Sequence, residues 1–287
     1  MIIAIVGPTG VGKTKMSVKL AKRYDAEIIS CDSMQVYKKM DVGTAKVTEV
    51  EKEGVKHHLI DIKEVWEDYS VYDYQKDARL VLDSLINRGK NVVIVGGTGL
   101  YLKALLYDYK FNEVTGRKDF SCYSNEELYN MVINIDKDTK IHVNNRQRLE
   151  SFLNNHQEGK ADLSQRLIYD AKIIGLTRPR DKLYEAIDKR VDQMVEAGLL
   201  AEAKQFYDAG INGKAINTAI GYKELYAYFD GKTSLIDAVN LIKQKSRNYA
   251  KRQYTWFNNQ MDVKWFDVDE VSFDKTFNKV VSYVENK

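Results

Sequence analysis

The stretch Gly7-Pro-Thr-Gly-Val-Gly-Lys-Thr14 decides the fold, because it matches the phosphate-binding pattern G-x-x-x-x-G-K-[ST] at every fixed position. The apolar run Ile2–Val6 before it predicts a buried strand, and the amphipathic pattern over Lys13–Tyr24 predicts a helix. Glycine backbone N–H groups and the helix N-terminus would surround phosphate oxygens, a lysine would add a positive charge, and a hydroxyl would ligate Mg²⁺. The residues expected to bind a diphosphate or triphosphate are Gly7, Thr9, Gly10, Gly12, Lys13 and Thr14, with Thr14 also the expected metal ligand.

Short β-branched runs alternate with longer helical patterns over the rest of the chain. This alternation is typical of a parallel sheet built from β-α-β units. We therefore expect an α/β fold, a P-loop NTPase-like parallel sheet flanked by helices. Further strands are expected at Glu27–Ser30, Asn91–Val95, Ala171–Leu176 and Val263–Val268, with a helix at Tyr72–Asn87 and an almost continuous helical region from Leu176 to Gln260 that breaks at Gly210–Gly213 and at Asp230-Gly231.

The character of the chain changes between the expected strands Asn91–Val95 and Ala171–Leu176. Residues 111–164 are polar and show weaker apolar periodicity, which predicts a small, mainly helical insertion domain. The core catalytic domain is then expected to comprise residues 1–110 and 165–287.

The composition of the chain excludes several classes of protein but does not identify a function. The chain has 287 residues and a net charge of only +3, so a nucleic-acid partner would need locally clustered basic residues. Its two cysteines, Cys31 and Cys122, are too far apart for a zinc knuckle, and their number suits a reducing compartment. No apolar run approaches the roughly 20 residues that cross a bilayer, and the N-terminal run lacks the features of a targeting peptide. We expect a cytoplasmic protein that does not contact membranes.

The sequence after the phosphate-binding loop disfavours a nucleotide hydrolase. Such an enzyme usually holds Mg²⁺ with an aspartate at the end of an apolar strand. Here Asn91–Val95 ends in Gly96-Gly97-Thr98-Gly99, and no guanine-reading motif follows. The remaining alternatives are a P-loop kinase and a transferase with diphosphate as the leaving group.

Asp32 is the carboxylate that follows the second expected strand. The carboxyl ends of parallel strands meet at the ligand crevice, so Asp32 could act there as a general base toward a hydroxyl or an amine. Its alternative role is to cap the next turn. Gln35 is of a type that reads an adenine edge, which favours a nucleobase as substrate.

A basic stretch lies near the end of the helical region. Lys243, Arg247 and Lys251 recur every four residues and predict one positively charged stripe on a helix. Tyr249 and Trp256 stand nearby and could stack on bases. A solvated charged face is the alternative interpretation, but the stretch contains no acidic residue, which favours contact with phosphates.

Taken together, these motifs resemble the tRNA dimethylallyltransferases, also called tRNA isopentenyltransferases. The resemblance covers nearly the whole chain outside the insertion. It is carried, in chain order, by Gly7–Thr14, Asp32-Ser-Met-Gln-Val-Tyr37, Gly43-Thr-Ala-Lys46, His57-His-Leu-Ile-Asp61, Gly96-Gly-Thr-Gly-Leu-Tyr101, Ile220-Gly-Tyr-Lys223 and Tyr249-Ala-Lys-Arg-Gln-Tyr-Thr-Trp256.

The resemblance implies that a dimethylallyl group passes from dimethylallyl diphosphate to N6 of the adenosine 3′ to the anticodon, with Mg²⁺ as cofactor. It implies that the P-loop binds the prenyl diphosphate, that Asp32 takes the N6 proton and that Thr98 contacts the reacting groups. The acceptor base would be flipped out of the anticodon loop of the tRNA. The residues expected to contact the tRNA are Asp32, Ser33, Met34, Gln35, Arg117, Gln147, Arg148, Lys223, Arg247 and Lys251.

This sequence departs from the family pattern mainly in the insertion, where Val143 replaces a proline and Glu150 and Ser151 replace small or basic residues. Three alternatives remain at this point. One is an adenylate isopentenyltransferase acting on free AMP or ADP, the second is a P-loop small-molecule kinase, and the third is a non-catalytic tRNA-binding protein. The chain is expected to act as a monomer.

Overall fold

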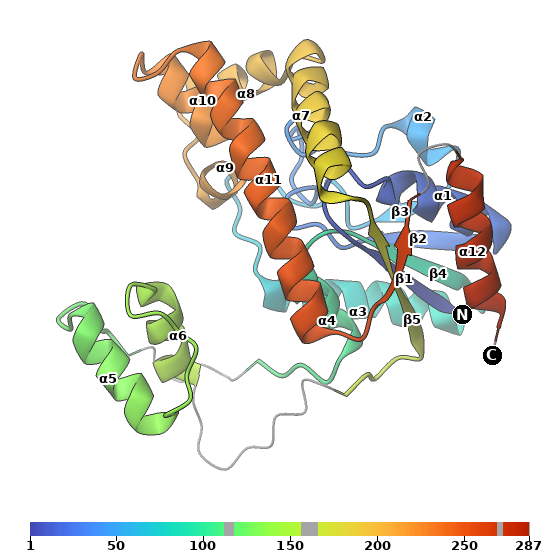
Figure 1. The fold of residues 1–287 in the computed structure, drawn as a ribbon, viewed down its shortest axis with the longest axis horizontal. Helices are drawn as coiled ribbons and strands as arrows, with labels where there is room; N and C mark the ends of the chain where they lie inside the picture. Colours follow the sequence, from blue (N-terminus) through green and yellow to red (C-terminus); the bar gives the residue numbers. More distant parts are fainter. Residues whose placement is uncertain (112–117, 156–165, 269–271, 287) are drawn as a thin grey trace. The chain divides into compact units, whose positions relative to one another are not determined.

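The computed structural model describes residues 1–111, 118–155, 166–268 and 272–286 (Figure 1). Six parallel strands form one sheet in the order β3-β2-β4-β1-β5-β6. The strands are β1 (Ile2–Val6), β2 (Ala26–Ser30), β3 (His57–His58), β4 (Asn91–Val95), β5 (Ala171–Thr177) and β6 (Lys264–Asp267). The sheet confirms the expected α/β, P-loop NTPase-like class and each of the expected strands.

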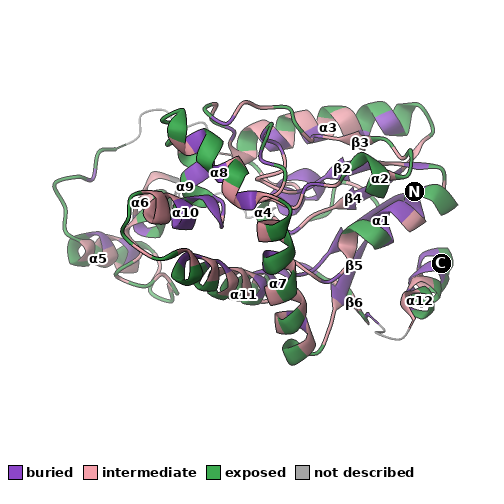
Figure 2. Ribbon diagram, turned by 90° about the horizontal axis from the view of Figure 1, so that it is seen from above, coloured by how far each residue is buried: buried purple, intermediate pink, exposed green. Residues whose placement is uncertain are grey.

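Helices cover both faces of this sheet. Successive side chains of β1 point to opposite faces, so the two cores can be followed along this strand. Ile2, Ala4 and Val6 pack into a core with α3 (Val71–Asn87) and α4 (Gly99–Leu106). Ile3 and Ile5 point the other way. Figure 2 shows the buried strands between exposed outer helix faces.

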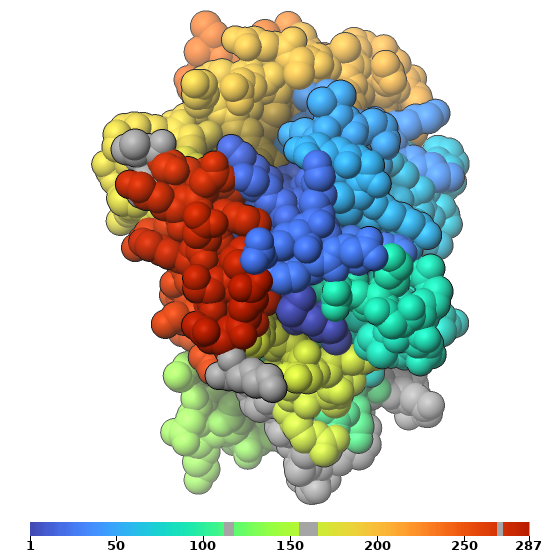
Figure 3. Space-filling model, turned by 90° about the vertical axis from the view of Figure 1, so that its right-hand side faces the viewer, coloured from blue at the N-terminus to red at the C-terminus, as the bar shows by residue number. Residues whose placement is uncertain are grey.

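The second core is closed by α1 (Lys13–Arg23) and by α12 (Phe273–Glu285). Figure 3 shows the C-terminal helix lying beside the N-terminal part of the chain, where Arg23 pairs with Glu285 at 2.8 Å. The sequence reasoning missed α12, although Phe273, Phe277, Val280 and Val284 have helical spacing. Burying this stripe makes the C-terminus part of the core.

The region expected to be almost continuously helical contains more breaks than expected. Besides the two expected breaks, the chain turns at Gly198, where φ is 102°, and at Gly221, where φ is 114°. Both values favour glycine, which has no side-chain clash there. The remaining helices are α2 (Glu49–Lys52), α5 (Asn125–Ile135), α6 (Arg146–Asn155), α7 (Arg180–Glu196), α8 (Leu199–Asp208), α9 (Lys214–Thr218), α10 (Tyr222–Phe229) and α11 (Leu235–Gln260).

The chain divides into two compact units. The first comprises Met1–Tyr109 and Ser164–Lys287, and the second is Lys110–Leu163. Within the second unit α5 and α6 pack through a small core of their own, whose buried members are Phe120, Leu128, Val132 and Leu149. Among the residues that the structure describes, no helix is long and apolar enough to cross a membrane.

Candidate active site

The phosphate-binding loop joins β1 to α1 and has the backbone conformation that its glycines allow. Gly10 and Gly12 have φ values of 79° and 98°, which side chains rarely adopt. At Gly7, a Cβ atom would lie 2.5 Å from the carbonyl oxygen of Leu176 on the neighbouring strand β5. The conformation of the loop therefore requires glycine at each of these three positions.

Lys13 folds back across this loop. Its ammonium group donates hydrogen bonds to the carbonyl oxygens of Gly7, at 2.9 Å, and Pro8, at 2.7 Å. The pKa of Lys13 is lowered to about 7, chiefly by burial and also by the positive charge of Arg190, while the negative charge of Asp32 acts in the opposite direction. Thr14, the next residue, is exposed at the start of α1. An anion bound beside this lysine would raise its pKa, because a nearby negative charge favours the protonated ammonium.

Arg190 is the functional candidate that the sequence reasoning missed. It comes from α7, and burial lowers the pKa of its guanidinium while Asp32 raises it. Its charge also acts on Lys13. Two basic side chains, Lys13 and Arg190, thus lie close together beside a glycine-rich loop. Such an arrangement attracts a multiply charged anion.

Asp32 follows β2, and the structure shows the capping role considered for it, while its role as general base stays a prediction. Its Oδ1 accepts hydrogen bonds from the backbone N–H groups of Met34, at 2.9 Å, and Gln35, at 3.3 Å, so this oxygen caps the turn. In the described part of the chain its Oδ2 has no hydrogen-bond partner. Its negative charge raises the pKa of both Lys13 and Arg190, so the carboxylate lies near these two cations.

Thr98 lies at the end of β4, between the loops of β1 and β2 in the sheet order. It is the N-cap residue of α4, yet its side chain does not cap that helix. Instead its Oγ1 accepts a hydrogen bond from the backbone N–H of Ser33 at 3.1 Å. Tyr249 of α11 also bonds to Thr98; burial raises the pKa of Tyr249 to about 12, helped by the negative charge of Asp32. Thr98 therefore fixes the turn that carries Asp32.

The glycines around Thr98 serve close packing within the protein. A Cβ on Gly96 would lie 1.9 Å from the carbonyl oxygen of Cys31, and one on Gly97 would lie 2.1 Å from Nε2 of Gln253. A Cβ on Gly99 would lie 2.0 Å from the ring of Trp256. The sequence left open whether this turn approaches a ligand or serves a tight turn. The structure shows that the turn is tight because its backbone packs directly against the residue after β2 on one side and against α11 on the other.

Gln35 is engaged within its own loop. Its Nε2 donates to the carbonyl oxygens of Thr44 and Ala45, both at 3.3 Å. Met34 packs against the adjacent core. Reading of an adenine edge by Gln35 stays a prediction, and in this conformation its amide N–H groups stabilise the loop over residues 41–46.

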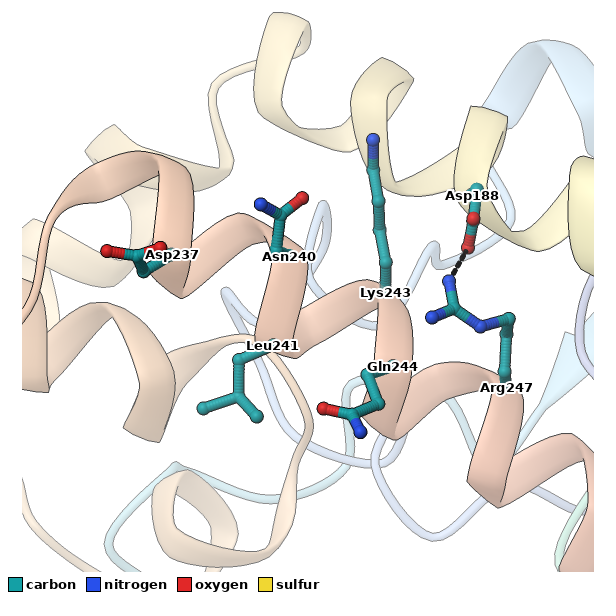
Figure 4. Close-up of a pocket in the computed structure, with 7 residues that line it drawn as sticks. All are labelled: Asp188, Asp237, Asn240, Leu241, Lys243, Gln244 and Arg247. Carbon is teal, nitrogen blue, oxygen red and sulfur yellow. Dashed lines mark hydrogen bonds and ion pairs between the residues drawn. The ribbon is translucent and has the colours of Figure 1, made fainter.

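Two of the three cations of the basic stripe on α11 are paired within the protein. Lys243 contacts Asp192 at 2.6 Å, and Arg247 contacts Asp188 at 2.5 Å (Figure 4). Both acids lie on α7, one helical turn apart, and Asp188 lines a surface hollow of about 630 Å³. The basic residues of α11 are therefore paired with acidic residues of α7, which are distant from them in the sequence. Lys251 is exposed.

A second hollow, of about 300 Å³, collects the other basic groups of this region. Lys223 is exposed at its edge, as is Arg252, which the sequence reasoning did not single out. Lys245 also lines it and pairs with Glu224 at 2.6 Å.

In the second unit, the residues predicted to contact tRNA face solvent in part. Gln147 and Arg148 are exposed on α6. The neighbouring Arg146 instead supports the unit, because it donates to the carbonyl oxygens of Phe120 and Tyr123 and pairs with Glu150. The departure at Glu150 from the family pattern thus has a structural partner. Arg117 lies outside the described residues.

The fold and the site define a P-loop α/β enzyme in which two cations face a carboxylate at a neighbouring strand end. A family model described as IPP transferase matches residues 35–260. The chain belongs to this IPP transferase family.

Known proteins are similar along the whole chain. A relative from Anoxybacillus flavithermus, named tRNA dimethylallyltransferase, is 46% identical over 300 residues, which cover 100% of this chain and 96% of the relative. A crystal structure of a tRNA isopentenylpyrophosphate transferase from Bacillus halodurans has a TM-score of 0.79 at 44% identity, covering 99% of this chain and 95% of that one. Crystallographic snapshots of a eukaryotic dimethylallyltransferase acting on tRNA give a TM-score of 0.83 at 28% identity, covering 98% of this chain and 77% of that one.

Proposed function

We propose that this protein is a tRNA dimethylallyltransferase that joins the dimethylallyl group of dimethylallyl diphosphate to N6 of the adenosine 3′ to the anticodon. The observation that carries the proposal is Asp32 at the end of β2, in the same sheet as the phosphate-binding loop after β1 and near enough to Lys13 and Arg190 to raise the pKa of both. The named relatives and their solved structures support tRNA as the acceptor over a free nucleotide and over phosphoryl transfer to a small molecule.

The donor diphosphate binds at the loop between β1 and α1. The backbone N–H groups of Gly10 and Gly12, the ammonium of Lys13 and the guanidinium of Arg190 hold its oxygens. Both cations stabilise negative charge as it grows on the leaving diphosphate, which is where electrostatic stabilisation lowers the barrier most. Thr9 contributes its hydroxyl, because its backbone N–H already donates to Gln253.

The donor set fits Mg²⁺. The Thr14 hydroxyl stands exposed at the start of α1, and the described residues hold no cluster of three or more His, Cys, Asp or Glu side chains suited to a metal. Thr14 would therefore share the ion with diphosphate oxygens and water, a ligand set that Mg²⁺ favours. When bound, the ion neutralises part of the diphosphate charge.

The acceptor adenine enters on the side of Asp32. Its N6 attacks C1 of the dimethylallyl group, the C1–O bond breaks, and the electron pair of that bond leaves with the diphosphate. Asp32 accepts the N6 proton on Oδ2, while its Oδ1 remains bound to the turn. The base must leave the stack of the anticodon loop to reach this position.

Contacts to the rest of the tRNA use the exposed basic and polar residues, namely Arg148 and Gln147 on α6, Lys223 on α10 and Lys251 on α11. Ser33, Met34 and Gln35 line the approach to Asp32. Asp188 offsets the positive charge of Arg247, so Arg247 should contribute less to phosphate binding than Lys251.

The test is incubation with radiolabelled dimethylallyl diphosphate and Mg²⁺ in the presence of total tRNA or of AMP. Label in tRNA, sensitive to Asp32→Ala, is the expected result. Label in AMP alone would refute the tRNA assignment. Phosphorylation of a small molecule by ATP, with no prenyl transfer, would refute the reaction class.

A further inference from the structure

Gln253 is a buried polar side chain with a partner at each end. It comes from α11 and is 5% exposed. Its Oε1 accepts a hydrogen bond from the backbone N–H of Thr9 at 3.0 Å, and its Nε2 donates to the carbonyl oxygen of Gly97 at 3.0 Å. One amide therefore connects the phosphate-binding loop to the loop of Thr98.

The connection continues from there to the turn of Asp32. The backbone N–H of Thr98 donates to the carbonyl oxygen of Cys31 at 3.2 Å, and the N–H of Ser33 donates to Oγ1 of Thr98 at 3.1 Å. These two bonds hold the residues on either side of Asp32. A continuous series of hydrogen bonds thus joins the loop that holds the donor to the carboxylate that takes the acceptor's proton.

The side-chain amide of Gln253 is tightly packed against the backbone of Gly97. Gly97 has no side chain, and a Cβ there would lie 2.1 Å from Nε2 of Gln253. A buried side-chain amide is favourable only when both its oxygen and its nitrogen are hydrogen-bonded. Losing either partner leaves an unsatisfied polar group in the core, which costs free energy. An apolar residue of similar size could fill the same volume without joining the loops.

We propose that Gln253 is a positioning residue that fixes the separation between the diphosphate-binding loop and the Asp32 turn and transmits the binding of diphosphate from one to the other. Its part in catalysis rests on the proposed function; the transmission of binding requires only that the loop binds diphosphate. Gln253 touches neither substrate. Displacing two reacting groups by about 1 Å can lower a rate by roughly 100-fold, so the loss should appear in the chemical step.

The first experiment measures hydrogen exchange of backbone amides with and without inorganic diphosphate and Mg²⁺. In the unaltered protein, diphosphate should slow exchange in the phosphate-binding loop and also at Met34 and Gln35. In Gln253→Leu the slowing should be confined to the loop. If diphosphate slows exchange in the loop of the unaltered protein but not at Met34 and Gln35, or slows it there equally in Gln253→Leu, the proposal is wrong whatever reaction the enzyme performs; no slowing in the loop itself would instead count against the proposed function.

The second experiment separates positioning from stability. Phe257→Leu is the matched control, because Phe257 is buried one turn further along α11 and is 1% exposed. Gln253→Leu should lower the single-turnover rate by about 10- to 100-fold while the Kd for diphosphate changes by no more than about threefold. Phe257→Leu should leave the rate within about threefold at a similar loss of thermal stability. Equal rate losses in the two variants would overturn the positioning role, whereas absence of prenyl transfer by the unaltered enzyme would instead overturn the proposed function.

Discussion

Replacing Lys13 by methionine should abolish activity and yet make the free protein more stable. Methionine has a similar length and no charge, so it keeps the packing while removing the ammonium. In the folded protein burial and Arg190 lower the pKa of Lys13 from 10.5 to about 7. A lowered lysine pKa means that the fold disfavours the charged form, and the penalty is largest at low pH, where the lysine must be charged.

The size of the effect follows from this pKa. At pH 7 the change from 10.5 to about 7 corresponds to a destabilisation of about 4 kcal/mol, and at pH 9.5 to about 1.4 kcal/mol. Because Lys13 keeps some contact with solvent and also donates two hydrogen bonds that methionine loses, we expect roughly half of this, about 2 kcal/mol at pH 7 and about 0.7 kcal/mol at pH 9.5. The stability of the unaltered protein should therefore rise with pH over this window relative to the variant.

Urea unfolding at pH 7 and pH 9.5 measures the difference. Lys15→Met is the control, since Lys15 is an exposed lysine of the same helix and should change the free energy of unfolding by less than about 0.5 kcal/mol at either pH. Inorganic diphosphate with Mg²⁺ should stabilise the unaltered protein and the control but not Lys13→Met. A variant less stable than the unaltered protein at pH 7, or a difference that does not shrink at pH 9.5, would refute the reasoning.

Three further substitutions test the site. Asp32→Asn should lower kcat by roughly 10²- to 10⁴-fold, with diphosphate binding unchanged or tighter by calorimetry, and an unchanged kcat would remove Asp32 from the mechanism. Arg190→Leu should weaken diphosphate binding by roughly 10- to 100-fold, while a Kd within twofold of the unaltered value would show that Arg190 does not reach the anion. Asp188→Asn, which frees Arg247, should change the free energy of unfolding by less than about 1 kcal/mol and tighten tRNA binding at low salt; weaker binding there would contradict the competition between Asp188 and phosphate.

The strands could be predicted from the sequence because each central strand is buried on both faces. Ile2–Val6 and Asn91–Val95 are short apolar runs that end in glycine, and the structure places both strands at those bounds. Asp32 and Thr98 could be placed near the loop for a related reason, since the ends of parallel strands converge. Local sequence determines both results.

The basic stripe shows where local sequence is insufficient. Lys243 and Arg247 look unopposed within their own helix, but their partners Asp192 and Asp188 lie more than 50 residues earlier in the chain. Only the packing of α7 against α11 brings the two stripes together. A charge pattern on one helix therefore predicts a binding surface only after the helix facing it is known.

Arg190 and Gln253 share a feature that could have revealed them. Arg190 follows the buried Leu183 and Ile187 at seven and three residues, and Gln253 lies three residues after the buried Ala250 and four before Phe257. Each polar side chain therefore occupies the apolar face of its helix. Burial there costs free energy unless partners are present. The partners of Gln253 are Thr9 and Gly97 in the loops at the carboxyl ends of the strands, and the charge of Asp32 acts on Arg190 from the same edge of the sheet. A polar residue on the core-facing stripe of a helix that follows a phosphate-binding loop is thus an indication that the helix reaches the site.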